Sequence, residues 1–194
     1  MLYLCQLDYP HVRYNHNVDN GGVPDERRCV KTSGCGLCCM SMVVDHLTTK
    51  SLPLEDCVKL SESCGANKKI GTNMNVLGSA AAELYGLKME RTDSLEEVNA
   101  TLRRGGRVIV NVGGDREGYI GLFSYSGHFI LLVSVDDDGN YCVLDPAFSE
   151  GRYDIEGRKG RILRQDGYFV YCKPEEILKD TANRKKAFYM FERK

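Results

Sequence analysis

The sequence predicts one α+β domain. Over residues 35–105 apolar side chains recur at helical spacing, whereas from Arg107 onward short apolar and β-branched runs are separated by turn signals. This segregation of helices from antiparallel strands is typical of the α+β class. The 194 residues suit one domain, and no internal repeat, linker or low-complexity tract divides them. We therefore expect residues 1–194 to form a single domain, with a helical N-terminal half packed on an antiparallel sheet from the C-terminal half.

The first predicted helices follow an irregular segment. Residues 1–34 are rich in Tyr, Asn, Asp and Gly and are expected to form extended chain and loops. A helix starts near Cys35, because apolar residues recur every three to four positions after it. A second helix is expected over residues 52–64, with Ser51 as its N-cap and Pro53 in its first turn.

Two further helices are recognised from their end signals. The helix expected over residues 74–85 has Asn73 as its N-cap and ends at Gly86. The next helix opens with Ser94 and Glu97, which have the spacing of a capping box.

The second half of the chain is expected to form antiparallel strands. Their predicted ranges are 107–112, 128–135, 141–144, 168–172 and 187–191. A hairpin turn over residues 136–140 joins the second of these strands to the third, and a short helix over residues 174–179 precedes the last. The Gly-, Ser- and Tyr-rich segment 113–127 is expected to border the functional site as a mobile wall or lid.

Charge and hydropathy argue against several functional classes. The formal net charge of -1 does not indicate a nucleic-acid-binding protein, and the basic segments 152–164 and 184–186 are expected to be solvated. The longest uninterrupted apolar run, residues 129–133, is far shorter than the roughly 20 residues of a membrane span. The N-terminus lacks the basic start of a signal peptide, which favours a cytoplasmic location, while a secreted mature form stays open.

Nine cysteines make the composition unusual. Because nine is odd, the chain cannot form a complete set of intramolecular disulfides, and at this length it needs none to fold. Most lie in apolar segments, where a free cysteine packs as a small hydrophobic residue. We therefore expect eight reduced packing residues and one reactive thiol. The nine are Cys5, Cys29, Cys35, Cys38, Cys39, Cys57, Cys64, Cys142 and Cys172.

Cys35 is the candidate nucleophile. It lies between two glycines at the start of a predicted helix, where free N–H groups and the helix dipole favour a thiolate. A buried cysteine after a turn glycine is the ordinary alternative, and a redox dithiol of Cys35 and Cys38 is another, although no βαβ strand precedes the pair. No metal site is predicted, because Cys57 and Cys64 have a poor spacing for a second ligand pair.

A cysteine nucleophile requires a base, and His128 fits best among the four histidines. His11 and His16 lie in the N-terminal loops. His46 is on the same predicted helix as Cys35 but eleven residues on, which is about 16 Å along the axis. His128 follows a glycine-rich loop and begins an apolar strand, where a hydrogen-bonded core histidine is the ordinary alternative.

Asp145 and Gln6 complete the candidate site. The hairpin between the strands of His128 and Asp145 brings both residues to one open end of the sheet, where the carboxylate could accept a hydrogen bond from the imidazole. A strand-ending Asp-Pro turn is the ordinary alternative. Gln6 precedes the nucleophile and could donate a side-chain N–H to an oxyanion beside the backbone N–H of Cys35, whereas the alternative is a surface glutamine.

Together these residues resemble the papain-fold cysteine peptidases, in particular the group similar to the bacteriocin-processing, double-glycine leader peptidases. The resemblance rests on Gln6, Cys35 between its glycines, His128 in the segment GHFILLV, and Asp145 before Pro146, in that order. It implies a papain-like fold with Cys35 as nucleophile, His128 as base, Asp145 as the residue that orients His128, and Gln6 as oxyanion donor. The 29 positions between Gln6 and Cys35 resemble the stand-alone branch, so a transporter-linked role is not expected.

The resemblance implies a cysteine-dependent hydrolase, a peptidase or amidase, that acts through a thioester on a peptide or amide substrate. Two other functions stay open. An acyltransferase would use the same triad and pass the acyl group to an amine instead of water. A dithiol redox or binding protein would use Cys35 and Cys38. Neither a cofactor nor a nucleic-acid partner is expected, and the sequence does not indicate the oligomeric state.

Overall fold

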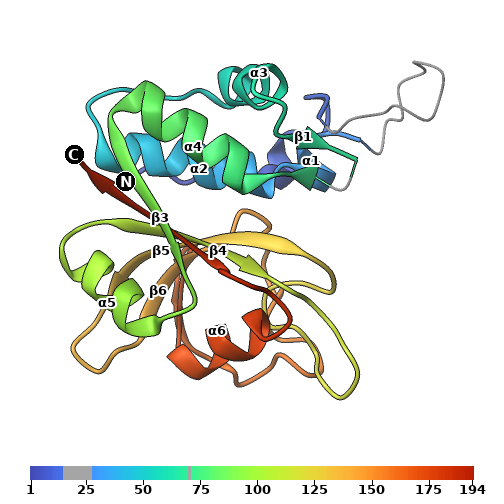
Figure 1. The fold of residues 1–194 in the computed structure, drawn as a ribbon. Coiled ribbons are helices and arrows are strands. Elements are labelled where there is room, and N and C mark those ends of the chain that lie inside the picture. The colour runs from blue at the N-terminus through green and yellow to red at the C-terminus, as the bar shows by residue number, and fades with distance from the viewer. Residues whose placement is uncertain (15–27, 70) are drawn as a thin grey trace.

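A seven-stranded antiparallel sheet forms the centre of the computed structural model, which describes residues 1–14, 28–69 and 71–194 (Figure 1). Within this described part of the chain the strands lie in the order β3-β9-β4-β5-β6-β8-β7. Their bounds are β3 (Leu87–Thr92), β4 (Arg107–Val112), β5 (His128–Val135), β6 (Tyr141–Leu144), β7 (Ile162–Asp166), β8 (Phe169–Cys172) and β9 (Phe188–Arg193).

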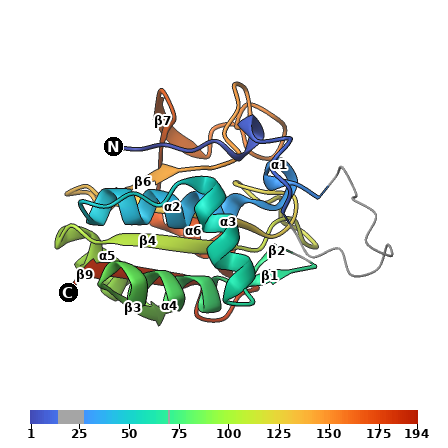
Figure 2. The ribbon, with the colours of Figure 1, turned by 90° about the horizontal axis from the view of Figure 1, so that it is seen from above.

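Helices cover both faces of the sheet. Those on one face come from the N-terminal half, and α2 and α4 lie side by side there (Figure 2). The elements of this layer are η1 (Gln6–Asp8), α1 (Val30–Ser33), α2 (Cys35–Leu47), α3 (Leu54–Ser63), the hairpin of β1 (Asn67–Lys68) and β2 (Gly71–Thr72), and α4 (Met74–Tyr85). The helices α5 (Leu95–Arg103) and α6 (Pro174–Thr181) pack on the opposite face. The predicted α+β class and the packing of N-terminal helices on an antiparallel sheet are confirmed.

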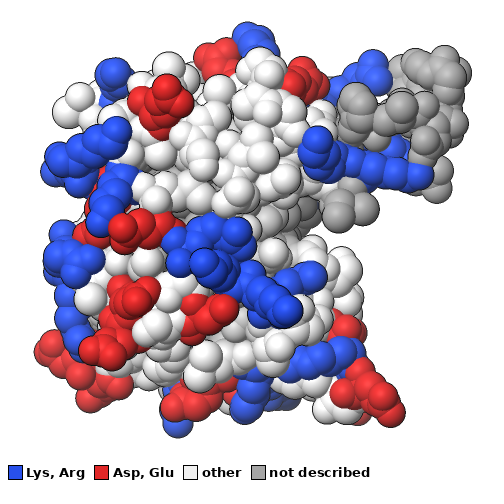
Figure 3. Space-filling view, in the orientation of Figure 1, with Lys and Arg blue, Asp and Glu red and all other residues white. Residues whose placement is uncertain are grey.

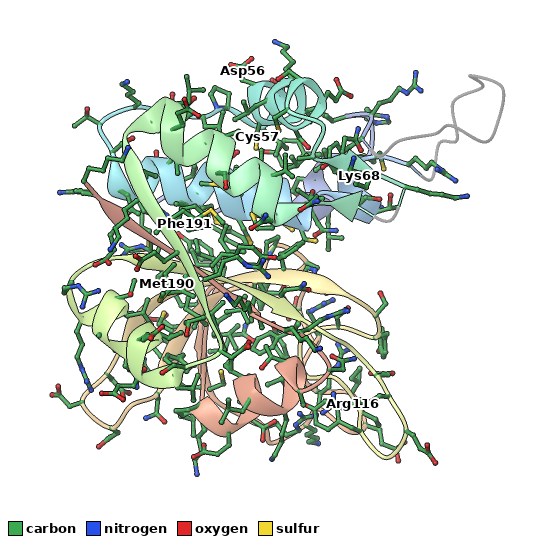
Figure 4. The ribbon with its side chains drawn as sticks, viewed as in Figure 1. Asp56, Cys57, Lys68, Arg116, Met190 and Phe191 are labelled. Atoms are coloured by element: carbon green, nitrogen blue, oxygen red, sulfur yellow. The ribbon has the colours of Figure 1, made fainter. Side chains whose placement is uncertain are left out.

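Two hydrophobic cores lie on the two faces of the sheet, and β9 contributes to both. Phe191 packs towards α2 and α4, whereas its neighbour Met190 packs towards α5 (Figure 4). The central helix α2 is buried on all sides, since ten of its 13 residues are buried between the sheet and the helices α3 and α4. This burial holds the N-terminus of α2 in a fixed place. No helix in the described ranges is long and apolar enough to cross a membrane.

The predicted helix ends are mostly confirmed. The side chains of Asn73 and Ser94 each accept a hydrogen bond from the backbone N–H three residues on, and Gly86 ends α4 with a φ of 71° that favours glycine. The predicted start of α3 is wrong. Pro53, not Ser51, is its N-cap, because the extended ψ of 148° at Pro53 keeps that residue outside the first turn.

The edge strands β3 and β7 were not expected from the sequence. Each pairs on one side only, β3 with β9 and β7 with β8. Four of the five residues of β7 are exposed, and in β3 only the two end residues are buried. These segments therefore lack the apolar run that identifies a strand, and pairing with a neighbouring strand stabilises them instead.

Candidate active site

Cys35 is the first residue of α2, and the close packing around it requires the glycines on both sides. A Cβ at Gly34 would lie 2.5 Å from Cγ1 and 2.7 Å from the carbonyl oxygen of Val30 in α1. A Cβ at Gly36 would lie 2.9 Å from Cβ of Thr72. The sharp turn from α1 into α2 therefore depends on glycine, and it places the half-buried Cys35 at the N-terminus of a buried helix.

His128 is the first residue of β5, and its imidazole lies between Cys35 and Asp145. It is 6% exposed, and its Nε2 lies 2.7 Å from Oδ1 of Asp145. Because Asp145 accepts from Nε2, Nδ1 is the nitrogen available to the Cys35 thiol, and the charges of the thiol and the imidazole interact. The predicted proximity of His128 and Asp145 at one end of the hairpin is confirmed.

Asp145 is fully buried and accepts four hydrogen bonds. Besides His128, the backbone N–H of Ala147 donates to Oδ1 at 2.8 Å. Nε of Arg152 donates to Oδ2 at 2.9 Å, and the hydroxyl of Tyr153 donates to the same oxygen at 2.7 Å. Burial alone would raise the pKa of Asp145, but the charge of His128, its hydrogen bond and the Arg152 guanidinium lower this pKa to about 2. The carboxylate is therefore ionised in the neutral range.

Arg152 and Tyr153 were missed as site residues, because the basic segment 152–164 was expected to be solvated. That expectation is wrong for three of its arginines, since Arg161 is half-buried beside Glu176. Arg152 contacts Asp145, and Arg158 is 1% exposed. A signal was present, since a buried ionised carboxylate needs a cation, but no periodicity in the sequence identifies which arginine supplies it.

The charges of Cys35 and His128 stabilise each other. Burial would raise the pKa of the Cys35 thiol, but the positive imidazolium of His128 and the backbone N–H groups of Phe129 and Gly36 outweigh it, so this pKa lies below its usual value. Burial would lower the pKa of His128, yet Asp145 and Cys35 together raise it to about 9. The two groups therefore favour each other's charged forms, a thiolate beside an imidazolium.

Cys35 and His128 line a cleft of about 430 Å³ between the helical layer and the sheet. In Figure 3 the molecule is hollowed between these two layers. The walls come from α1 and α2, the β1–β2 hairpin, strands β4 and β5, and the turn after α6. The residues are Thr32, Ser33, Cys35, Gly71, Thr72, Asn111, Ser126, Gly127, His128, Phe129 and Arg184. Most of the side chains are polar, as suits a site that binds the backbone of a peptide.

Gln6 is close to the segment that leads to Cys35 but is not among the described residues that line the cleft. Its Nε2 donates to the carbonyl oxygen of Lys31 at 2.8 Å, and its backbone N–H donates to the carbonyl oxygen of Pro146 at 2.7 Å. Gln6 therefore joins α1, which precedes Cys35, to the turn after Asp145. It is 6% exposed, so the surface alternative is wrong.

The other histidines lie away from this cleft or outside the described residues. His11 is exposed, and His16 falls in the segment 15–27 that the structure does not describe. His46 lies near the far end of α2, where its Nε2 is 2.7 Å from the carbonyl oxygen of Leu2 and Nε of Arg107 donates to its Nδ1 at 3.2 Å.

The remaining cysteines behave as packing residues. Six of the eight are buried, while Cys5 and Cys64 are half-buried. Burial raises the pKa of Cys38 and Cys39 well above the usual range of a thiol, so both stay protonated near neutral pH. Within the described residues, no cluster of three or more His, Cys, Asp or Glu side chains could hold a metal ion.

The segment 113–127 borders the cleft as predicted, through Ser126 and Gly127, but the rest of it is fastened to the body of the protein. Asp180 in α6 is fully buried and accepts from the backbone N–H of Phe123 at 3.0 Å and from the hydroxyl of Tyr119. Further along the chain, the buried guanidinium of residue 158 donates to the backbone of the same loop at 2.8 Å. These bonds favour a fixed wall over a mobile lid.

Comparisons with known proteins identify the family and the fold. The model of the Peptidase_C39 like family matches residues 6–162. A protein described as a C39-like peptidase from Bacillus anthracis is 12% identical, with a TM-score of 0.53 over 95% of this chain and 96% of that one. The peptidase domain of Streptococcus ComA, a bi-functional ABC transporter involved in a quorum sensing pathway, is 12% identical, with a TM-score of 0.54 over 95% of this chain and 100% of that one. A search of curated proteins found no match. The chain belongs to the Peptidase_C39 like family and is a cysteine peptidase with a papain-like fold.

Proposed function

We propose that residues 1–194 act as one catalytic domain that hydrolyses a peptide or amide bond, with Cys35 as nucleophile, His128 as acid and base, and Asp145 as the residue that positions His128. One observation carries the proposal. A single buried imidazole bonds to a carboxylate through one nitrogen, and it lines the same cleft as a thiol at a helix N-terminus, with which it interacts electrostatically. This arrangement supplies the activated nucleophile and the proton donor that acyl transfer requires.

The first half of the reaction forms a thioester. The Cys35 thiolate attacks the carbonyl carbon of the scissile bond, and the carbonyl electrons move to its oxygen. The tetrahedral intermediate then collapses, the C–N bond breaks, and the imidazolium of His128 protonates the leaving amine. Asp145 holds the ring in the orientation needed for this transfer, since it accepts from Nε2 and leaves Nδ1 towards the sulfur.

The second half releases the acyl group. His128, now neutral, takes a proton from a water molecule that attacks the thioester carbonyl. The C–S bond breaks, Cys35 leaves as a thiolate, and His128 is again an imidazolium. The pair that begins the next cycle is thereby restored, which agrees with a pKa of His128 near 9.

For the oxyanion we propose two donors, the backbone N–H of Cys35 and the side chain of Gln6. One N–H of the Gln6 amide donates to Lys31, and the second is free to donate to another acceptor. Replacing Gln6 by Ala should lower kcat by about 10²- to 10³-fold with little change in KM. A loss of stability without a loss of kcat would instead assign Gln6 a structural role between α1 and Pro146.

Neither of the other functions is favoured by a specific observation. A dithiol enzyme needs a second reactive thiol, but Cys38 is fully buried and its pKa is raised by that burial. An acyltransferase would be supported by a deep apolar channel, whereas most of the side chains lining this cleft are polar. Incubating the enzyme with a peptide that it cleaves, in the presence of glycinamide, distinguishes water from an amine as the acyl acceptor. A hydrolase yields the free acid as the main product.

The decisive test is alkylation near pH 7 followed by peptide mapping. Iodoacetamide should modify Cys35 fastest, and both Cys35→Ala and Cys35→Ser should lose the rapid modification together with peptide hydrolysis. Cys64→Ala is the matched control, because Cys64 is another half-buried thiol outside the cleft, and this variant should behave as the wild type. Rapid modification at a different cysteine would refute the assignment.

A further inference from the structure

The turn between α6 and β9, residues 182–187, carries three consecutive basic residues that differ in their surroundings. Lys185 and Lys186 are exposed, as predicted for a solvated segment. Arg184 is half-buried and lines the cleft together with Cys35 and His128. The expectation of a solvated segment is therefore wrong for this arginine, and the proposed triad does not use it.

Two side chains, one in β3 and one directly after it, fix the backbone of this turn. Nη2 of Arg91 donates to the carbonyl oxygens of Lys185 and Lys186, at 3.3 and 2.9 Å. Oδ1 of Asp93 accepts from the backbone N–H of Ala187 at 3.0 Å. Lys186 has a φ of 48°, a left-handed conformation that residues other than glycine adopt only when their surroundings impose it. The turn is thus held in one conformation.

The guanidinium of Arg184 lies next to the strand that carries His128. Its Nη2 is 3.5 Å from the carbonyl oxygen of Val112, the residue that pairs with His128 across β4 and β5. A Cβ at Gly127, the residue before His128, would lie 2.9 Å from the same nitrogen. Asp145 follows β6, on the other side of β5. The arginine therefore contacts the strand on one side of β5, and the aspartate follows the strand on the other side.

Arg184 has no carboxylate partner among the residues that the structure describes, and its buried Nε has no hydrogen-bond acceptor there. Two other half-buried arginines are paired. Arg152 lies 2.9 Å from Asp145, and Arg161 lies 2.6 Å from Glu176. A partly buried guanidinium without a counter-charge is costly unless a bound group supplies one. A guanidinium in a cleft that has no carboxylate partner also presents a fork of N–H donors that matches the two oxygens of a carboxylate.

We propose that Arg184 binds a carboxylate of the peptide substrate at one position relative to the scissile bond. This proposal rests on the proposed function and adds a substrate class to it. Because the turn is fixed, Arg184 lies at one distance from Cys35, so the preference applies to a single substrate position. Basic side chains also border the hollow in Figure 3, and the exposed Lys185 and Lys186 would attract acidic peptides to it.

Cleavage of a synthetic peptide library by the wild type and by Arg184→Met tests the preference, with Lys185→Met as the matched control that removes one charge from the same turn. The wild type should favour a carboxylate at one position. Arg184→Met should lower kcat/KM for those peptides by about 10- to 100-fold and leave their Gln and Asn analogues unchanged. Lys185→Met should keep the preference, and an equal loss in both variants would overturn the proposal.

The source of the carboxylate is identified with paired peptides. The two peptides of the first pair differ in their C-terminus, which is a carboxylate in one and a carboxamide in the other. The two peptides of the second pair differ at the preferred position, which is Glu in one and Gln in the other. Arg184→Gln serves as a second variant if methionine destabilises the turn, which thermal unfolding would show. A preference for the carboxylate that persists in both Arg184→Met and Arg184→Gln would overturn the proposal.

A binding experiment separates this proposal from the proposed function. Cys35→Ala protein, which cannot form a thioester, should retain acidic peptides from the library, and Cys35→Ala/Arg184→Met protein should not. If the acidic peptides are retained through Arg184 while the wild type cleaves no peptide, the carboxylate site stands and hydrolysis fails. If both proteins retain the same peptides, the carboxylate site is refuted.

Discussion

Replacing Asp145 by Asn tests the electrostatic design of the site. The substitution keeps an oxygen acceptor for Nε2 of His128 but removes the negative charge. The increase in the pKa of His128 from 6.5 to about 9 is worth about 3 kcal/mol of imidazolium stabilisation, at 1.36 kcal/mol per unit. Burial opposes this increase, and Asp145 contributes more to it than Cys35 does. The charge of Asp145 is therefore the largest single contribution that raises this pKa.

The pKa of His128 in Asp145→Asn is expected to fall by more than one unit, from about 9 towards 7 or below. Arg152, which lies 2.9 Å from Oδ2, would lose its counter-charge and repel the imidazolium further. In the double variant Asp145→Asn/Arg152→Met, the pKa of His128 should lie between its values in Asp145→Asn and in the wild type. Because the imidazolium stabilises the thiolate, alkylation of Cys35 at pH 7 should slow about tenfold in the single variant.

NMR titration of the imidazole signals measures this pKa directly. The chain has four histidines, so a His128→Gln spectrum identifies the signal. Each titration is paired with the rate of iodoacetamide modification between pH 5 and 10. A pKa that stays near 9 in Asp145→Asn, with an unchanged alkylation rate, would refute the assignment of the imidazolium stabilisation to this carboxylate.

Three further changes have defined expected outcomes. Gly34→Ala places a methyl group against the backbone of Val30 and should lower the free energy of unfolding by about 1–3 kcal/mol in urea denaturation. Asp180→Asn weakens a buried acceptor of backbone N–H groups and should cost about 1.5–3 kcal/mol, with faster hydrogen exchange at Phe123. In the wild type, the depressed pKa of Asp145 stabilises the fold above about pH 4, so this contribution should be lost progressively as the pH falls towards 2.

The Asp180→Asn variant has a matched control. Asp154→Asn changes an exposed carboxylate and should leave both stability and exchange unchanged. An unfolding free energy of Gly34→Ala equal to that of the wild type would show that α1 can move away from α2 without cost. A stability that does not change between pH 4 and 2 would contradict the low pKa of Asp145.

The parts of the site that are local in sequence could be predicted. His128 and Asp145 flank one short hairpin, so strand pairing alone brings them together. The position of Cys35 follows from a helix start between two glycines. The α+β class follows from the change of hydrophobic period near residue 105.

The parts that depend on long-range packing could not be predicted. Arg152 reaches Asp145 through a loop that has no periodic signal. Arg184 reaches the cleft because its turn is bound by β3, a strand whose alternating charged residues do not identify it. The contact of Gln6 with Lys31 likewise depends on how the N-terminal segment crosses α1.

The place of β9 in the sheet determines when the sheet can be completed during synthesis. This last strand lies between β3 and β4 and pairs with both of them. A nascent chain that ends before residue 188 contains Cys35, His128 and Asp145, but its β3 and β4 have no strand to join them. Such pairings between distant segments are slow to form. A peptidase assembled in this order acquires its complete sheet only after almost the whole described chain has left the ribosome.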